Sequence, residues 1–233
     1  MDDEQTEPRL RGKHPIEDLI YDRLVDAIID KHLRAGEHVN EVKLAEAYDV
    51  PRSRVRRVLE RLRDEDVVVF ELNRGAFISR PTVEEARHVY EARRELELIT
   101  VRLACERAGP ADLDRLRAHL RVERDAFDKH DPGVNRIAGE FHYLIASIAG
   151  NPVIEKMLAV LIRRGVLIQS VYERKGGILC LTHEHERMVE HIAERRPQDA
   201  MDEMLHHFEH ILASLDLSET RRLEADIYEF LRD

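Results

Sequence analysis

Apolar residues recur at helical spacing in three short segments near the start of the chain. Residues 16–28 form one amphipathic face, and we expect this helix to end near Ala35-Gly36, where the glycine can cap it. Two shorter helices are expected over 41–48 and 52–63, with Pro51 just before the latter. Because only a tight turn separates them, these two helices form a helix-turn-helix unit.

The pattern then changes to short apolar runs on either side of a polar tip. Residues 67–70 and 76–78 are typical of two strands, and the tip between them contains Arg74 and Gly75. A hairpin in this position is the wing of a winged helix-turn-helix. In that fold one helix enters the major groove of DNA, and a wing-tip arginine can reach a phosphate or the minor groove.

Everything after Pro81 has the pattern of helices. Thr82 and Glu85 predict a capping box, and no strand signal follows. The expected fold class is therefore mostly α: an N-terminal winged helix-turn-helix with a small β-hairpin wing, followed by an all-α bundle of six or seven helices. The helices are expected over 83–108, 111–129, 135–149, 152–173, 183–195, 197–215 and 219–231.

These patterns set the expected domain boundaries. We expect a flexible acidic N-terminus over 1–13, the winged helix-turn-helix over 14–80, the bundle over 82–217 and a C-terminal helix over 218–233. No apolar run approaches the roughly 20 residues of a membrane span, and the polar N-terminus does not resemble a signal peptide. A cytoplasmic protein without a membrane partner is expected.

The distribution of charge changes what the net charge indicates. The net charge of −10 argues at first against nucleic acid. However, residues 81–233 carry 22 Lys and Arg against 29 Asp and Glu, whereas residues 52–63 carry six arginines and one acidic residue. Ser53, Arg56 and Arg57 lie opposite the apolar stripe of that helix. The helix could therefore present guanidinium groups to DNA, although a merely solvated charged face is the alternative.

Three of the thirteen histidines fall on the apolar faces of three different helices. His142, His185 and His207 are expected to face the bundle interior, which suits a metal site with three nitrogen ligands and open positions. Hydrogen-bonded core histidines are the alternative. Helical phase directs three other histidines outward, namely His183, His206 and His210.

An enzyme is a competing interpretation of the histidines, because a metal held by them could activate water for hydrolysis. Helical phase places no Asp or Glu on the inward faces of His142, His185 and His207 to act as a general base. Glu140, two residues before His142, points away from its face. A hydrolase also leaves the arginine-rich helix without a role.

Residues 16–80 resemble the winged-helix domain of GntR-type bacterial transcription regulators, through the segment LAEAYDVPRSRVRRVLERL at 44–62. Arg52, Ser53, Val55, Arg56 and Leu59 match the family pattern. Pro51, Arg54, Arg57 and Asp66 replace its usual Ser, Pro, Glu and Gly, which affects the expected base preference more than the fold. The DNA-contacting residues that we expect are Arg52, Ser53, Arg54, Arg56, Arg57, Arg74 and Gly75.

The rest of the chain resembles the FadR-like subgroup, whose C-terminal domain is the FCD effector domain. The matching motifs are Arg93-x-x-Leu-Glu97, Phe141-His142, Ala149-Gly-Asn-Pro152, Glu184-His185 and Met204-x-x-His207. The resemblance implies a divalent metal at His142, His185 and His207, zinc in the first place, with nickel or another transition metal as alternatives. It also implies a small organic acid at that metal. Arg93 could hold its carboxylate, or could instead pair with Glu97 on the surface.

One departure concerns the metal. The family's usual fourth ligand, Asp or Asn, falls here on Ala138, which has no donor atom. The site would then contain three histidines and water, bind metal weakly, or be a metal-free pocket for an acyl-type effector. The expected function is a ligand-responsive regulator, a repressor of a catabolic operon, that binds pseudo-palindromic double-stranded operator DNA as a homodimer.

Overall fold

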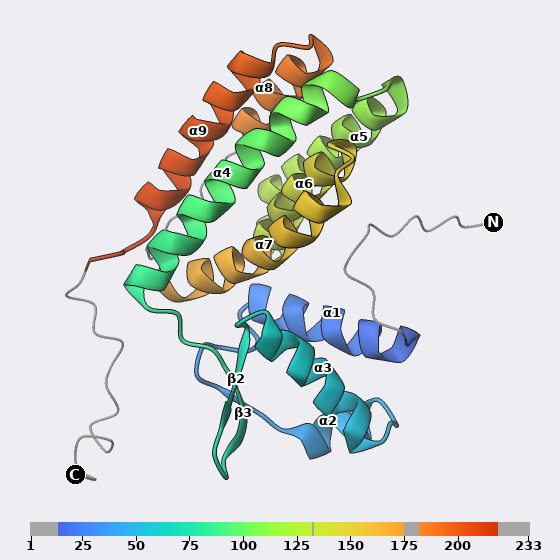
Figure 1. Cartoon of the computed structure of the whole chain (residues 1–233), viewed down its shortest axis with the longest axis vertical. Coiled ribbons are helices and arrows are strands. Elements are labelled where there is room, and N and C mark those ends of the chain that lie inside the picture. The colour runs from blue at the N-terminus through green and yellow to red at the C-terminus, as the bar shows by residue number, and fades with distance from the viewer. Residues whose placement is uncertain (1–13, 132, 175–181, 219–233) are drawn as a thin grey trace.

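The structure of the protein, a computed structural model, describes residues 14–131, 133–174 and 182–218. The described chain is mostly helical, with one small sheet, as expected (Figure 1). The expected N-terminal segment 1–13 and the expected helix 219–231 lie outside the described residues. None of the described helices combines the length and the apolar composition that a bilayer crossing requires.

The first part of the chain forms the winged helix-turn-helix. The helices of the turn and the two wing strands lie within two residues of their expected positions. The elements are α1 (Pro15–Ile29), β1 (His38–Val39), α2 (Glu41–Ala47), α3 (Arg52–Asp64), β2 (Val68–Glu71) and β3 (Gly75–Ile78). The sheet has the order β1-β3-β2 and both pairings are antiparallel.

Two expectations about this part need correction. The first helix ends at Ile29, well before Ala35-Gly36, and Lys31 takes the left-handed conformation with φ 60°. Gly36, with φ 78°, lies instead in the turn before β1, where its N–H donates to the Ile78 carbonyl at 2.7 Å. Strand β1 was not expected, because two residues are too short to show the two-residue alternation of a strand.

The second part is a helical bundle whose bounds agree with the expected ones within two residues. Its helices are α4 (Val83–Arg107), α5 (Pro110–Asp128), α6 (Val134–Ile148), α7 (Pro152–Tyr172), α8 (Thr182–Ala193) and α9 (Pro197–Ser214). The capping box is confirmed: Glu85 N–H donates to Thr82 Oγ1 at 3.1 Å, and Thr82 N–H donates to Glu85 Oε2 at 2.7 Å.

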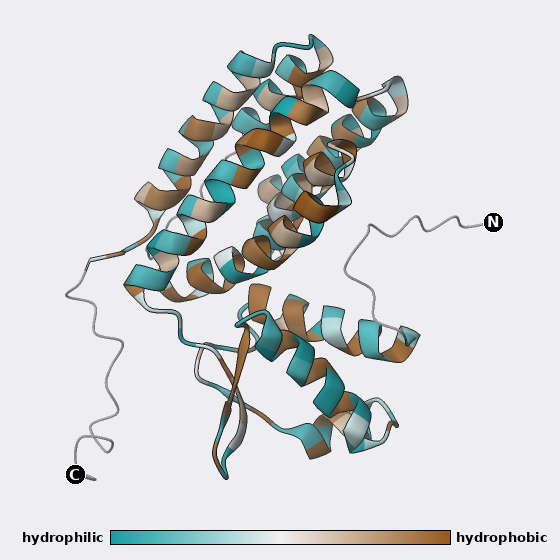
Figure 2. Ribbon diagram, in the orientation of Figure 1, coloured by the Kyte–Doolittle hydropathy of each residue, from teal (hydrophilic) through white to brown (hydrophobic). Residues whose placement is uncertain are grey.

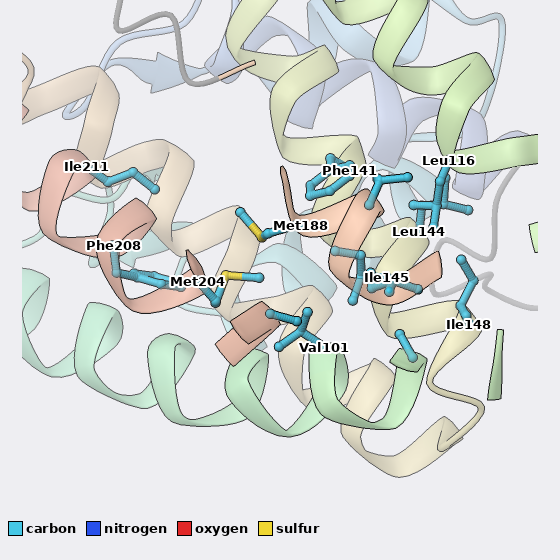
Figure 3. Packing of buried hydrophobic residues seen from close by; sticks show 14 of the residues in the cluster. Val101, Leu116, Phe141, Leu144, Ile145, Ile148, Met188, Met204, Phe208 and Ile211 are labelled. Atoms are coloured by element: carbon cyan, nitrogen blue, oxygen red, sulfur yellow. The ribbon is translucent and has the colours of Figure 1, made fainter. Parts of the chain in front are cut away.

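Each part has its own buried apolar cluster. The bundle cluster draws on α4 to α9 and includes Phe141, Met188, Met204 and Phe208 (Figure 3). The winged-helix cluster lies among α1, α3 and the sheet, and it also contains Leu167 from α7. Figure 2 shows apolar and polar residues alternating around the helices, as expected for helices that bury one face. The division at Pro81 remains a prediction, since α7 contributes to both clusters.

Candidate functional site

Helix α3 is anchored by its apolar face. Val55, Val58, Leu59 and Leu62 are buried, and α3 packs against α1 and α2. Arg52, Ser53, Arg56 and Arg57 are exposed on the other side, as the helical pattern predicts. Figure 2 shows this helix as predominantly hydrophilic. Burial of one face therefore fixes which polar groups α3 presents to a partner.

The arginines of α3 differ in how firmly acidic residues hold them. Arg57 pairs with Glu17 of α1 at 2.5 Å and Arg54 pairs with the same oxygen at 3.4 Å. The hydrogen bond from Arg57 lowers the pKa of Glu17. Arg52 and Arg56 have longer contacts, 3.6 Å to Glu41 and 3.4 Å to Glu60, and their side chains are 65% and 59% exposed. Arg52 and Arg56 are thus the most available to an anion.

The first turn of α3 is a second anion-binding feature. Pro51 occupies the N-cap position, and no side chain in the described structure accepts a hydrogen bond from the first N–H groups of α3. These groups carry the positive end of the helix dipole. A phosphate could bind there beside Arg52 and Ser53.

The wing places Arg74 at its tip. Arg74 pairs with Glu71, its side chain is 62% exposed, and the neighbouring Leu72 is 88% exposed. Gly75 begins β3 with φ 96°, a conformation that favours glycine, and an added Cβ would lie 3.1 Å from His38 Nε2. Gly75 therefore shapes the turn that presents Arg74.

We predict that Arg56→Ala weakens binding of a specific duplex by about 1–3 kcal/mol, because an exposed guanidinium on this face would contact a base edge or a phosphate. Fluorescence anisotropy with a labelled duplex measures the effect. Arg63→Ala is the matched control: Arg63 lies on the last turn of α3 and pairs with Asp64 at 2.7 Å. An affinity equal to wild type in Arg56→Ala would remove Arg56 from the recognition surface.

The three histidines converge inside the bundle. His142 on α6, His185 on α8 and His207 on α9 are buried, and one ligand atom from each lies within 4.8 Å of the others. Phe141 stacks on His185, with ring centroids 4.0 Å apart. The outward direction of the other histidines is also confirmed, since His183, His206 and His210 are exposed.

Three carboxylates accompany the histidines. The expectation that no Asp or Glu shares their inward faces is wrong for α8, where Glu184 is buried next to His185, whereas Glu97 and Glu123 come from other helices. Glu123 on α5 accepts from His185 Nδ1 at 2.9 Å, and Glu184 on α8 accepts from His207 Nδ1 at 2.9 Å. Glu97 on α4 accepts from His142 Nδ1. Each carboxylate fixes the tautomer of its histidine and leaves Nε2 with its lone pair toward the centre.

The distance between two of the Nε2 atoms fits a metal ion. Two ligands of a tetrahedral ion, each about 2.0–2.1 Å from it, are about 3.3 Å apart, and His142 Nε2 and His207 Nε2 are 3.3 Å apart. His185 Nε2 is buried and has no hydrogen-bond partner in the described structure. Burial lowers the pKa of His142 to about 4 and that of His207 to about 3, so both are neutral ligands at pH 7.

A small cavity lies beside the histidines. Ala138 and Gly139 of α6 line it, as do Val166 and Gln169 of α7. Ala138 therefore faces the site, where its methyl group supplies no ligand. Glu140 lines a different cavity and pairs with Arg136 at 3.0 Å, in agreement with its expected direction.

Arg93 lies in the same cavity but not on the surface. It is 3% exposed, and its Nε donates to Glu97 Oε1 at 2.5 Å. Of the two alternatives for Arg93, the pairing with Glu97 is present, but it lies in the interior and not on the surface, because α4 turns this face toward α7 and α9. Burial acts to raise the pKa of Glu97, but Arg93 and His142 outweigh it and lower that pKa. Arg93 thus holds the carboxylate that orients His142.

Comparison with known proteins places both parts of the chain. Residues 17–78 match the gntR family of bacterial regulatory proteins, and residues 88–210 match the FCD domain. The Nta operon transcriptional regulator of Aminobacter aminovorans is 33% identical over 124 residues, 53% of this chain and 59% of that protein. This chain thus covers less than two thirds of that relative.

Two further relatives align over most of their length. The uncharacterized HTH-type transcriptional regulator YdhC of Bacillus subtilis (strain 168) is 24% identical over 195 residues, 82% of this chain and 86% of that protein. A GntR crystal structure from Rhodococcus sp. RHA1 has a TM-score of 0.73 and 25% identity, covering 86% of this chain and 99% of that one.

Proposed function

The chain belongs to the GntR family of bacterial regulatory proteins and carries an FCD domain, and from this we propose a cytoplasmic, ligand-responsive repressor of a catabolic operon. Its winged helix-turn-helix would bind operator DNA, and its bundle would bind a small organic acid at a metal centre. The convergence of one ring nitrogen from each of the three buried histidines carries the metal and effector part of this proposal.

The exposed side of α3 and the wing support the DNA-binding part. Arg52 and Arg56 would contact guanines or phosphates, Ser53 a base edge or phosphate, and Arg74 the flanking phosphates. Arg54 and Arg57 would join them if Glu17 released their guanidinium groups. Gly75 would act through the shape of the wing turn.

The donor set supports zinc, with nickel or another transition metal as alternatives. His142, His185 and His207 would hold the ion through Nε2, and their carboxylate partners would keep each ring oriented. When bound, the ion would act as a Lewis acid that attracts an anionic oxygen. Arg93, in the wall of the same cavity, would add a charge-assisted hydrogen bond to an effector carboxylate.

Exposed apolar side chains support a homodimer. Ile99 on α4 is 37% exposed, and Val153 and Met157 on α7 are 66% and 56% exposed. Helices α4 and α7 pack against each other. Self-association through such side chains would pair two α3 helices, as a pseudo-palindromic operator requires.

Each of two alternative functions is supported by one specific observation. Ala138 in the cavity wall favours a metal-free pocket for an acyl-type effector. The buried carboxylates give the metal-dependent hydrolase the acidic residues that it lacked on sequence grounds. However, Glu97, Glu123 and Glu184 each accept from a histidine Nδ1, and this contact occupies them as orienting groups rather than as a base toward water.

Duplex selection from a random library, followed by metal analysis of the purified protein, tests the proposal. We expect an enriched pseudo-palindromic sequence and close to one equivalent of a divalent ion per chain. No enriched sequence would refute the regulator. Less than about 0.2 equivalents after zinc supplementation would refute the metal centre, since a site of three inward histidines should be filled under those conditions.

We also predict that Ala138→Asp tightens zinc binding by about tenfold or more, because a carboxylate would enter the cavity beside three nitrogen ligands. A competition titration with a chromophoric chelator measures the affinity. Ala138→Asn is the matched control for size, and it should have a smaller effect because the amide is uncharged. Unchanged zinc affinity in Ala138→Asp would show that Ala138 does not face the ion.

A further inference from the structure

A buried polar network connects the winged helix-turn-helix to the bundle. Tyr21 of α1 donates its hydroxyl to Glu65 Oε2 at 2.5 Å, and Arg163 of α7 donates Nε to the same oxygen at 2.7 Å. All three residues are buried. Glu65 directly follows α3, so this network fastens the end of the arginine-rich helix to the bundle.

Helix α7 contacts both the histidine cavity and the winged-helix part. Ile162, Val166 and Gln169 line the histidine cavity, and Ile162 and Val166 also line a pocket beside α1. Arg163 and Leu167, in between, face the winged-helix part, where Leu167 joins its apolar cluster. Figure 1 shows α7 as the bundle helix nearest α1, in agreement with the contacts between these helices. A displacement of α7 by a ligand in the cavity would therefore be transmitted to Glu65.

The interface around this network contains a small pocket. It lies between α1 and the pair α6 and α7, and its walls include Tyr21, Val25 and Arg163. Arg163 Nη2 is buried and has no hydrogen-bond partner in the described structure. Buried polar groups normally have hydrogen-bond partners. A second arrangement of the interface, in which Arg163 Nη2 gains a partner, could therefore be close in free energy to the arrangement seen here. Space at the interface allows the change.

We propose that the Tyr21–Glu65–Arg163 network is the switch through which the histidine cavity controls the position of α3. This inference rests on the proposed regulatory function. With the network closed, the winged helix-turn-helix is held against α7. With it open, the two parts reorient about the connection at Pro81.

Hydrogen–deuterium exchange of the full-length protein tests the switch, with Zn²⁺ as the probe. In the wild type, Zn²⁺ should change the amide exchange rates around His142 and His207 and also in residues 61–71. The change in rate should be about fivefold or more, which is the lower end of the usual coupling between two sites. Arg163→Met, which keeps the volume but removes the link, should retain the first change and lose the second. Arg164→Met is the matched control, since Arg164 pairs with Asp66, which is 68% exposed.

A second arm works in the other direction, because coupling between two sites is reciprocal. The duplex enriched by the wild type should change exchange in α6 and α9 of the wild type and of Arg164→Met, but not of Arg163→Met. Circular dichroism confirms that each variant is folded. A response that crosses the interface in Arg163→Met, or that is missing from the wild type, would overturn the switch.

The two arms separate this inference from the proposed function. If Zn²⁺ does not change amide exchange near the histidines, the proposed metal centre is refuted, and the experiment with the duplex then tests the switch. If the protein binds neither probe, the regulator fails and the switch fails with it.

Discussion

Replacing His185 with alanine is expected to weaken zinc binding by more than about 100-fold. Its Nε2 is the buried ligand atom without a partner, and loss of a coordinating atom should exceed the roughly 10–100-fold effect of losing an outer partner. Competition against a chromophoric chelator measures the affinity, and metal content after gel filtration gives an independent value. Zinc binding at wild-type strength would show that His185 is not a ligand of the ion.

His183→Ala is the control for this experiment. His183 lies on the same helix, two residues before His185, and is exposed, so its removal should leave zinc binding unchanged. Hydrolase activity, if any is found, should be measured in the same two variants, His185→Ala and His183→Ala. Turnover lost in His185→Ala while binding of the selected duplex persists would favour the enzyme over the regulator.

The second large effect is on stability. Glu65→Ala is expected to lower the free energy of unfolding by about 3–5 kcal/mol, because it removes one partner of a buried ion pair and leaves the Arg163 charge uncompensated. The side chain of Arg163 is only 6% exposed, so water cannot replace the carboxylate. Urea denaturation followed by circular dichroism measures the change, with each transition fitted separately if the two parts unfold independently.

Asp66→Asn provides the contrast. Asp66 pairs with Arg164 at 3.1 Å but is 68% exposed, and such pairs contribute about 0–1 kcal/mol. Asparagine is chosen because Asp66 has φ 58°, which alanine would adopt at a cost. Equal effects of Glu65→Ala and Asp66→Asn would mean that the network does not fasten the two parts together.

The bundle helices could be predicted closely because proline, glycine and capping residues mark their ends, as Thr82 and Pro152 do. The end of α1 could not, because Lys31 adopts a positive φ without a glycine to signal it. The inward positions of the three histidines followed from helical phase. That these histidines bind a metal remains a prediction, and so do the DNA contacts of the α3 and wing residues.

The carboxylates around the histidines were missed for a physical reason. Helical phase places Glu184 on the buried face of α8, four residues before Met188, but its partner His207 comes from α9, which the pattern of a single helix does not show. Glu123 is similar, since its partner His185 comes from another helix. Each carboxylate nevertheless had a signal within its own helix, since Glu123 lies three residues after the buried Leu120 and Glu97 lies four residues after Arg93.

The hold of Glu17 on Arg54 and Arg57 has a consequence for discrimination between DNA sequences. A phosphate that approaches these arginines must displace a carboxylate that already neutralises them, so Glu17 acts as a built-in competitor of the DNA backbone. Binding through Arg57 then releases fewer counterions than a free arginine would, which makes random-sequence binding weaker and less steeply dependent on salt. Arg52 and Arg56 do not share this competitor, and sequences that engage them gain the advantage.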